Sequence, residues 1–408
     1  MRVALALGLV VVLVLGGGCG SKQHKQATLV VAVDAPFSRT PYVGETIEHG
    51  VALAIADVNA RGGIVSRGTR YTLRVKRSDN ALSPRKAVEN VRRALQDDAV
   101  AIVTDGTGMD ATWELARDAG VPICIVYEGG IGLVDPDRRP NVFRIAPTDR
   151  GISFRLAEYI VPKGLKIALL TDDSGYGQHG RSALKKAFRT IPRSVAARIT
   201  LPTSASDLSP QVLAARRSGA TALLVWAQAP TLAKTIAAAR TFGWQVPIFT
   251  TPSGEDPLVR QQLADHPSWI DGLTFGSGRM TAERGPAPWN AYASRYEQAY
   301  GADFVGVKTR SGQRVVQPPD YGMYPFDFVN VLAAALTQSK GQTGAKLLDA
   351  LNEVTTEGAN GDQRGFNRRN HEGVVDDDVY FARFRDMIFR PVKDDPLSST
   401  LPTIPQTR

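Results

Sequence analysis

The sequence predicts an α/β protein with two lobes, each built on a doubly wound parallel sheet. Short apolar runs alternate with segments whose apolar residues recur at helical spacing, and this alternation fills two successive blocks. The chain has 408 residues, of which 43% are hydrophobic. It is therefore long enough for two domains, each with its own core.

The first block runs from residue 27 to residue 127. Its predicted strands are "ATLVVAVDA" (27–35), "YTLRVKRSD" (71–79), "VAIVTD" (100–105) and "PICIVY" (122–127), and its predicted helices are 45–60, 83–96 and 109–119. The first helix ends at "RGG", where glycine commonly terminates helices. Ser83 and Pro84 occupy the positions that the start of the second helix favours.

The second block repeats this scheme. Extended segments are predicted at 141–147, 166–173, 194–200, 220–228 and 246–254, with helices at 150–161, 176–191, 209–219 and 230–244. Each strand is followed by a helix, which is the order that places parallel strands in one sheet.

The remaining elements are too few for a third domain. They comprise a strand at 271–280, helices at 287–301, 324–339 and 344–354, and a hairpin at 379–392. We assign residues 28–147 and 276–362 to lobe 1, and residues 148–275 and 363–393 to lobe 2. Residues 394–408 contain three prolines together with serine and threonine, and we predict that this tail is disordered.

The N-terminus predicts export. Arg2 precedes a long apolar run that ends in three glycines and Cys19, so residues 1–18 are predicted to be a signal peptide and residues 19–27 a tether. A cysteine at this place resembles the lipidation site of bacterial lipoproteins, although Gly16 stands where leucine is usual. We expect an exported protein anchored in a membrane through a lipid on Cys19. An ordinary signal peptide or an uncleaved anchor helix is the alternative.

Composition and motifs exclude several functions. The net charge of +9 comes from dispersed arginines without interleaved aromatic residues, so no nucleic-acid partner is predicted. No C-x-x-C pair, H-x-x-x-H spacing, P-loop or G-x-S-x-G motif occurs. Neighbouring acids such as Asp172 and Asp173 point to opposite faces of a strand. We therefore predict no metal, no cofactor and no enzymatic activity.

The segment "GTGMDA" (106–111) is the strongest candidate for a binding turn. It follows an apolar run, opens a helix, and precedes Glu128 at a spacing similar to that of the dinucleotide-binding fingerprint. However, it follows the third strand of its block, whereas that fingerprint follows the first. The same turn also suits a carboxylate, because free N–H groups and the positive helix end attract any anion. We expect a small solute here, with a plain structural turn as the alternative.

Three segments together resemble the leucine/isoleucine/valine-binding family, the type I periplasmic solute-binding proteins of ABC transporters. They are "LVVAVDAPFS…YVGETIEHGVALAIADVNARGGI", "LTDDSGYGQHGRSALKKAF" and "QRGFNRRNHEG". The resemblance covers about residues 28–392. It implies two lobes joined by three crossovers, a ligand bound at the hinge, and an ABC permease as partner.

The resemblance also implies a ligand-binding set on the turns that follow strands. Its members are Tyr42, Gly106, Thr107, Tyr127, Glu128, Gly129, Tyr176, Gln228, Ser253 and Tyr321. Gly106 and Thr107 match positions that hold a ligand carboxylate, and Tyr176 matches the tyrosine that covers the ligand.

Two positions depart from the amino-acid binders of this family. Ser253 stands near the place where an acid usually meets the ligand ammonium, with Glu255 two residues further on. The turn "YEGG" is similar to that of amide- and urea-binding members. We expect a branched-chain or other amino acid, with an amide or urea-like compound as the alternative. A sensing module that signals through a receptor is an alternative to transport.

Overall fold

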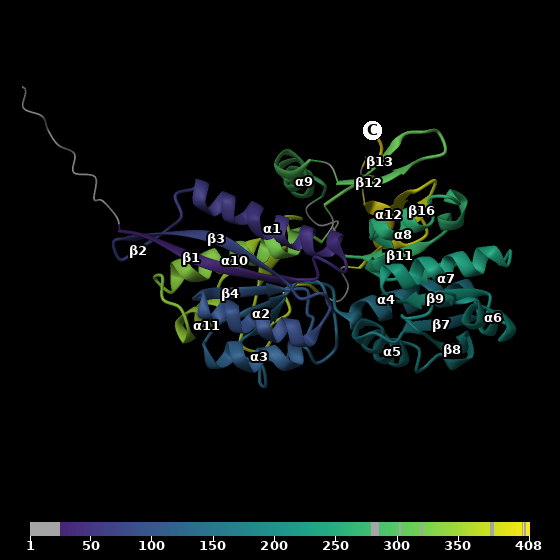
Figure 1. Ribbon diagram of the computed structural model, residues 1–408, viewed down its shortest axis with the longest axis horizontal. Helices are drawn as coiled ribbons and strands as arrows, with labels where there is room; N and C mark the ends of the chain where they lie inside the picture. The colour runs from purple at the N-terminus through teal and green to yellow at the C-terminus, as the bar shows by residue number, and fades with distance from the viewer. Residues whose placement is uncertain are drawn as a thin grey trace, which may run out of the picture.

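The computed structural model describes residues 25–278, 285–301, 303–319, 321–375, 379–401, 403 and 405–408. These residues form two α/β lobes that lie side by side along the long axis of the molecule (Figure 1). Each lobe contains one large, mostly parallel sheet. The fold class predicted from the sequence is therefore confirmed.

The sheet of lobe 1 has β1 near its centre. Its strands in spatial order are β2 (Ile64–Ser66), β3 (Thr69–Asp79), β1 (Lys25–Ala35), β4 (Ala99–Thr104), β5 (Ile123–Ile125) and β6 (Val142–Arg144). All neighbours are parallel except the edge strand β2, which runs antiparallel to β3. Every residue of β4, β5 and β6 is buried, which explains why these strands read as continuous apolar runs.

The sheet of lobe 2 combines parallel strands with an antiparallel edge. Its strands in spatial order are β17 (Ile388–Pro391), β16 (Tyr380–Arg385), β11 (Thr274–Ser277), β10 (Ile248–Thr250), β9 (Ala222–Trp226), β7 (Ile167–Asp172) and β8 (Val195–Leu201). Strands β16 and β17 form the hairpin predicted near the C-terminus, and β16 pairs antiparallel with β11.

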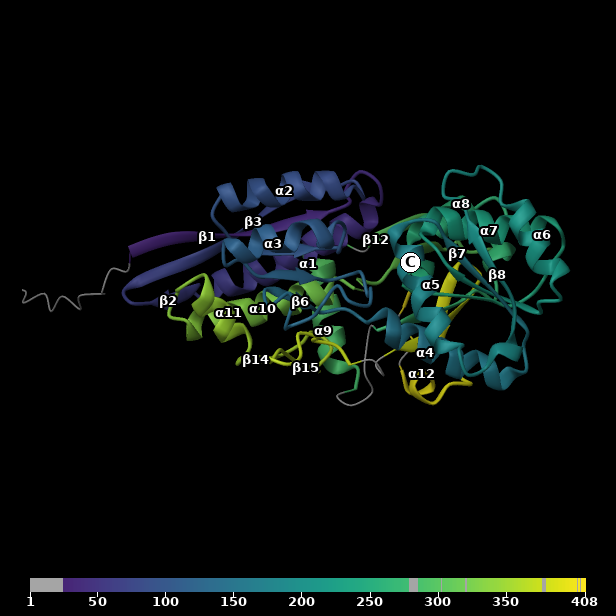
Figure 2. The ribbon, with the colours of Figure 1, turned by 90° about the horizontal axis from the view of Figure 1, so that it is seen from below.

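Helices cover both sheets. They are α1 (Pro41–Ala60), α2 (Pro84–Gln96), α3 (Met109–Asp118), α4 (Asp149–Ile160), α5 (Gly175–Ala187), α6 (Ser209–Arg217), α7 (Ala229–Thr241), α8 (Pro257–Gln262), α9 (Ala287–Tyr300), α10 (Met323–Gln338), α11 (Ala345–Leu351) and α12 (Pro396–Thr400). Ser83 caps α2 as the sequence predicts, because its hydroxyl accepts from the Lys86 N–H. Helices α1 and α10 pack together in lobe 1, whereas α4 and α5 pack together in lobe 2 (Figures 1 and 2).

The chain leaves lobe 1 later than residue 363, where we placed the boundary. Strand β15 (Gln363–Gly365) pairs with β14 (Thr355–Glu357) beside α10. The imidazole of His371 then bonds the carbonyl of Val142, and Glu372 pairs with Arg144, both in β6. These long-range contacts hold residues 363–372 in lobe 1. The chain passes to lobe 2 between Glu372 and Tyr380.

A second difference concerns residues 303–317, which we assigned to lobe 1 without predicting strands there. They form the hairpin of β12 (Asp303–Lys308) and β13 (Arg314–Gln317). The hairpin contacts α8 of lobe 2 (Figure 1). The Gln261 side chain donates to the Val305 carbonyl at 2.9 Å, and Arg260 donates to the Gln317 side chain. Sequence reasoning predicted neither these strands nor their contact with lobe 2.

The prediction of a disordered tail was wrong for the described residues after 394. Helix α12 is capped by Asp395, which also accepts from Arg155 at 2.9 Å. The Gln406 side chain exchanges two hydrogen bonds with the backbone of Phe389, and the backbones of Arg408 and Arg314 pair with each other. Prolines and serines indicated a coil, but lobe 2 supplies partners for its polar groups.

The predicted signal peptide and Cys19 lie outside the described residues. Among the described residues, Cys124 is the one free cysteine, and it is fully buried in β5. Burial raises the pKa of its thiol far above the usual range. No helix in the described part of the chain is long and apolar enough to cross a membrane.

Candidate functional site

Two adjoining pockets lie where the lobes meet, and Tyr127 and Tyr176 line both of them. Their walls come from the turns that follow β1, β3, β4, β5 and β6 in lobe 1 and β9, β10 and β11 in lobe 2. The first turns of α1, α4, α5, α7 and α10 complete them. Ligands of parallel α/β proteins bind at these carboxyl ends of strands, because the following loops and helix starts are free to face a cleft there. The two pockets are therefore the candidate ligand site.

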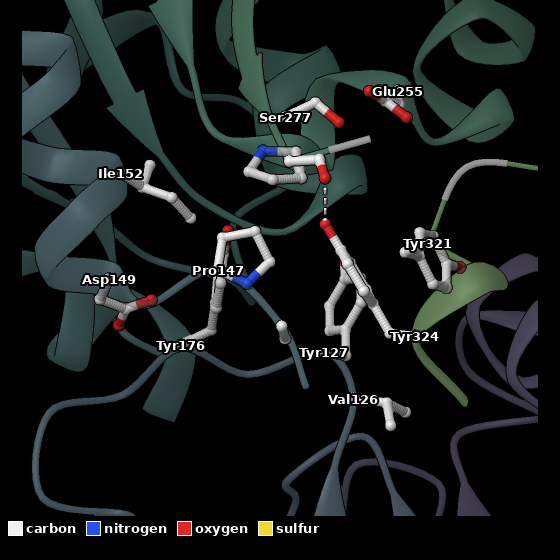
Figure 3. A pocket seen from close by; sticks show the side chains of 13 residues that line it. Val126, Tyr127, Pro147, Asp149, Ile152, Tyr176, Glu255, Ser277, Tyr321 and Tyr324 are labelled. Atoms are coloured by element: carbon white, nitrogen blue, oxygen red, sulfur yellow. Dashed lines mark hydrogen bonds between the residues drawn. The ribbon is translucent and has the colours of Figure 1, made fainter. Parts of the chain in front are cut away.

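We call the first one the tyrosine pocket. Four tyrosines line it together with two acids, and Figure 3 shows their side chains around a common space: Tyr127, Tyr176, Tyr321, Tyr324, Asp149 and Glu255. The Tyr127 and Tyr321 rings meet edge to face at 5.1 Å between centroids. The Tyr324 hydroxyl donates to the Gly278 carbonyl at 2.7 Å, which fixes that ring at the passage between lobes.

We call the second one the acidic pocket. Its polar lining combines three acids with side chains of lobe 2: Asp105, Glu128, Asp256, Gln228 and Ser253. The Asp172 carboxylate accepts from the Gln228 backbone N–H at 2.8 Å and so holds the turn that starts α7. The Tyr176 hydroxyl donates to Thr251 at 2.7 Å, and the Thr251 and Ser253 hydroxyls are 3.0 Å apart. These bonds arrange the wall from lobe 2.

The structure brings most of the predicted binding set to these pockets. Their linings include Tyr127, Glu128, Tyr176, Gln228, Ser253 and Tyr321. Tyr42, Gly106, Thr107 and Gly129 do not line either one. Tyr42 stands behind Tyr321, whose hydroxyl donates to the Tyr42 carbonyl at 3.3 Å. Gly129 lies against the first residue of α4, where a side chain at position 129 would overlap Asp149.

The predicted anion cradle at Gly106 and Thr107 bonds to a carboxylate of the chain itself. The Thr107 hydroxyl donates to Asp105 Oδ2 at 2.6 Å, and the Thr107 backbone N–H also bonds this carboxylate. The Gly106 N–H donates to the Thr104 hydroxyl at 3.1 Å. On the other side, Asn80 donates to Asp105 Oδ1 at 2.7 Å. The donors that we assigned to a ligand are therefore occupied within the chain: those of Thr107 hold Asp105, and that of Gly106 bonds Thr104.

Gly106 also leaves room for the side chain of Glu128. Its φ of +115° lies in the region that glycine tolerates best, and a Cβ at this position would lie 2.7 Å from Glu128 Cβ. A glycine is thus needed for the Glu128 side chain to lie across the turn. The two features of the fingerprint-like motif, the glycine and the acid, are in contact.

Arg144 positions the turn that carries Glu128. Its buried guanidinium donates to the carbonyls of Glu128 and Gly130 at 3.1 and 3.0 Å. The rest of the guanidinium forms a two-point ion pair with Glu372 at 2.8 and 2.6 Å. Sequence reasoning missed Arg144, because an arginine inside a short apolar strand gives no sign of its partner.

The acids of the site have raised pKa values. Burial raises the pKa of Glu128 to about 8, with further increases from Asp105 and Asp149. Burial likewise raises the pKa of Asp149 to about 7 and that of Asp256 to about 6. Each carboxylate is therefore in an environment that penalises its negative charge.

Sequence reasoning also missed Asp149 and Asp256 as site residues. Both stand where an acid is common for another reason: Asp149 opens α4, and Asp256 caps α8 by accepting from the Leu258 N–H at 2.9 Å. Because this local role accounts for each acid, neither one stands out in the sequence.

Two α/β lobes with polar pockets between them are the architecture of ligand-binding proteins that close around a small molecule. The sequence model of the periplasmic binding protein family matches residues 30–387, and the chain belongs to this family. A curated relative, Leu/Ile/Val-binding protein homolog 7 of Brucella abortus (strain 2308), is 28% identical over 209 residues. The alignment covers 46% of this chain and 49% of the relative, so the chain spans about half the length of the curated relatives it matches.

Solved structures agree on the fold. A type 1 periplasmic binding protein from Bordetella pertussis Tohama I superposes with a TM-score of 0.77 at 19% identity, covering 90% of this chain and 100% of that one. The branched-chain amino acid transporter substrate-binding protein LivJ of Streptococcus pneumoniae, solved with isoleucine, gives 0.73 at 19% identity, covering 90% and 99%. At these identities the similarity concerns the fold.

The raised pKa values predict a pH-dependent stability. The folded protein retains protons on Glu128, Asp149 and Asp256 at pH values where the unfolded chain has released them. Stability without ligand should therefore fall as pH rises from about 4 to about 8, because the native state binds more protons than the unfolded state. Melting temperatures measured by calorimetry across this range test the trend.

Asp149→Asn should make this fall smaller, since the variant has no carboxyl to ionise at that site. Asp118→Asn is the matched control, because Asp118 lies on the surface and pairs with Arg117. Melting curves of Asp149→Asn that follow the pH dependence of the unmodified protein would contradict the assignment.

Proposed function

We propose that this chain is the solute-binding component of an ABC uptake system and captures a small polar molecule between its lobes. Membership of the periplasmic binding protein family supports the class. The observation that carries the proposal is the position of the two pockets, which draw their walls from both lobes and share Tyr127 and Tyr176. A ligand there contacts both lobes at once, which is the condition for stabilising a closed form.

The proposed ligand carries a nitrogen group. Glu128 and its neighbouring acids can accept hydrogen bonds from an ammonium or an amide, and such a partner offsets the cost of burying them. Solved structures of this fold hold different solutes, and the Streptococcus pneumoniae protein named above holds isoleucine. A Desulfitobacterium hafniense protein holds leucine and a Rhodopseudomonas palustris protein holds 3,4-dihydroxybenzoic acid. An amino acid remains one candidate, and an amide or urea-like compound is the other.

In this proposal the chain performs no reaction. A partner permease with its ATPase would accept the solute and supply the energy for transport. The proposal also includes export and a lipid anchor at Cys19, which would keep the protein beside the permease.

A thermal-shift screen of amino acids, amides and polyamines tests the binding function. A solute that binds only the native state raises the melting temperature, and the rise grows with the logarithm of the ratio of its concentration to its Kd. We expect at least one hit, and its binding should be confirmed by calorimetry. A screen without any hit would contradict the proposal.

Glu128→Gln should weaken the binding of that hit by about 1.5–3 kcal/mol, because a charge-assisted acceptor is lost. Calorimetric titration measures the change. Glu89→Gln is the matched control, since Glu89 lies on the exposed face of α2 and pairs with Arg85. Equal affinity in the Glu128 variant would remove Glu128 from the binding site.

Cys19→Ser should release the protein from membranes into the soluble fraction, because the variant has no thiol to acylate. Fractionation of cells followed by immunodetection measures the distribution. If the variant sediments with membranes as the unmodified protein does, Cys19 is not the anchor.

A further inference from the structure

The two pockets have an excess of acidic groups. Asp149 and Glu255 line the tyrosine pocket, and Asp105, Glu128 and Asp256 line the acidic pocket. Among the described residues, no lysine, arginine or histidine lines either one. A ligand that enters them therefore meets carboxyl groups on several sides.

Two guanidinium groups act electrostatically on the pocket acids, that of Arg144 on Glu128 and Asp149 and that of Arg260 on Asp256, but neither lines a pocket. Arg144 is bound by Glu372 and by the carbonyls of Glu128 and Gly130. Arg260 is fully buried behind Glu255, whose carbonyl accepts from it at 3.0 Å, and it also donates to Gln317. Both cations are engaged within the protein and neither contributes a wall of a pocket.

Asp149 is an independent indication of a ligand. The residue is only 1% exposed, and its Oδ2 atom is buried without a hydrogen-bond partner. Figure 3 shows the carboxyl group at the edge of the tyrosine pocket, turned toward Pro147 and Tyr176. An unpartnered buried carboxylate is costly, and a positively charged donor in the pocket would remove the cost.

The turn at Gly106 and Thr107, where we expected a ligand carboxylate, holds the side chain of Asp105 instead. Asp105 accepts from the Thr107 hydroxyl and from Asn80, so the Thr107 donors of the cradle already bond a carboxyl group. A ligand carboxylate would lie beside Asp105 and Glu128, whose own negative charges are already penalised by burial. The charge of Arg144 acts on Glu128, but its guanidinium is already paired with Glu372. Like charges at such short range raise the free energy of the bound state.

From these contacts we infer that the solute is an organic cation with an ammonium or amidinium group and no carboxylate. This inference rests on the proposed function and narrows its ligand class. The positive nitrogen lies against Asp149 or Glu128, and its apolar carbon atoms lie against the tyrosine rings. Aromatic faces attract such cations through the ring quadrupole and bury their alkyl parts.

The geometry favours an organic cation over a metal ion. Among the described residues, no group of three histidine, cysteine, aspartate or glutamate side chains could hold a metal ion. The acids are instead distributed around the two tyrosines that both pockets share, Tyr127 and Tyr176. This distribution suits an extended molecule with an apolar body.

A matched set of probes tests the inference by calorimetry on the purified protein. Leucine, leucinamide and 3-methylbutylamine have the same side chain and an ammonium group, but only leucine has a carboxylate. 3-Methylbutanamide is the neutral amide probe. We expect leucinamide and 3-methylbutylamine to bind at least tenfold more tightly than leucine and the amide.

Asp149→Asn should lower the affinity for the two amine probes at least tenfold, and the surface control Asp118→Asn should not. The Asn variant keeps the shape of the side chain and removes a buried charge. Its melting temperature without ligand should equal or exceed that of the unmodified protein, which shows that it folds. Unchanged amine affinity in Asp149→Asn would overturn the inference.

The outcomes separate the two proposals. Leucine or the neutral amide binding as tightly as the amines, or a screen whose hits all carry carboxylates or no charge, overturns the inference and leaves the solute-binding function in place. No binding by these probes and no hit in the wider screen overturns both.

Discussion

The burial of carboxyl groups where the two lobes meet is the constraint on which the site depends. A carboxylate removed from water must find donors, lose its charge or meet a cation. Asp105 finds donors in Asn80 and Thr107, and Asp172 finds them in the turn that begins with Gln228. Asp149 has an oxygen without any donor. Asp105 and Asp172, which have hydrogen-bond donors, fix the turns that form the pocket walls. The ligand chemistry that we infer follows from Asp149, which has an oxygen without a donor.

The local parts of the fold could be predicted from the sequence. Apolar periodicity identifies the strands of both sheets except the short edge strand β2, and Ser83 before Pro84 marks the start of α2 as the structure has it. The distribution of late elements between lobes could not be predicted in the same way. It depends on hydrogen bonds that local sequence patterns do not reveal. His371 bonds Val142, which lies far away in the chain, and Gln406 bonds Phe389 from a segment whose composition predicts a coil.

The residues of the candidate site were likewise predicted only in part from the sequence. Tyr127, Glu128 and Tyr176 stand on turns that resemble those of a known family, and the structure places them in the pocket walls. Asp149 was missed because an acid at a helix start already has a local explanation. Gly106 and Thr107 were predicted as donors to an anion from their backbone setting, and the residue that fills this setting is their own neighbour, Asp105. Which anion occupies a cradle depends on side-chain placement, and a motif does not specify it.

Cys124 has a practical consequence for the study of lobe motion. The sequence contains two cysteines, and this one is enclosed in β5 with a thiol that ionises only far above neutral pH. In a protein whose residue 19 is serine, it would be the sole thiol and would resist alkylating dyes. Cysteines introduced in pairs, one on the surface of each lobe, would then accept spin labels or fluorophores at known positions. Their separation would report directly how far the lobes open and how a solute changes that distance.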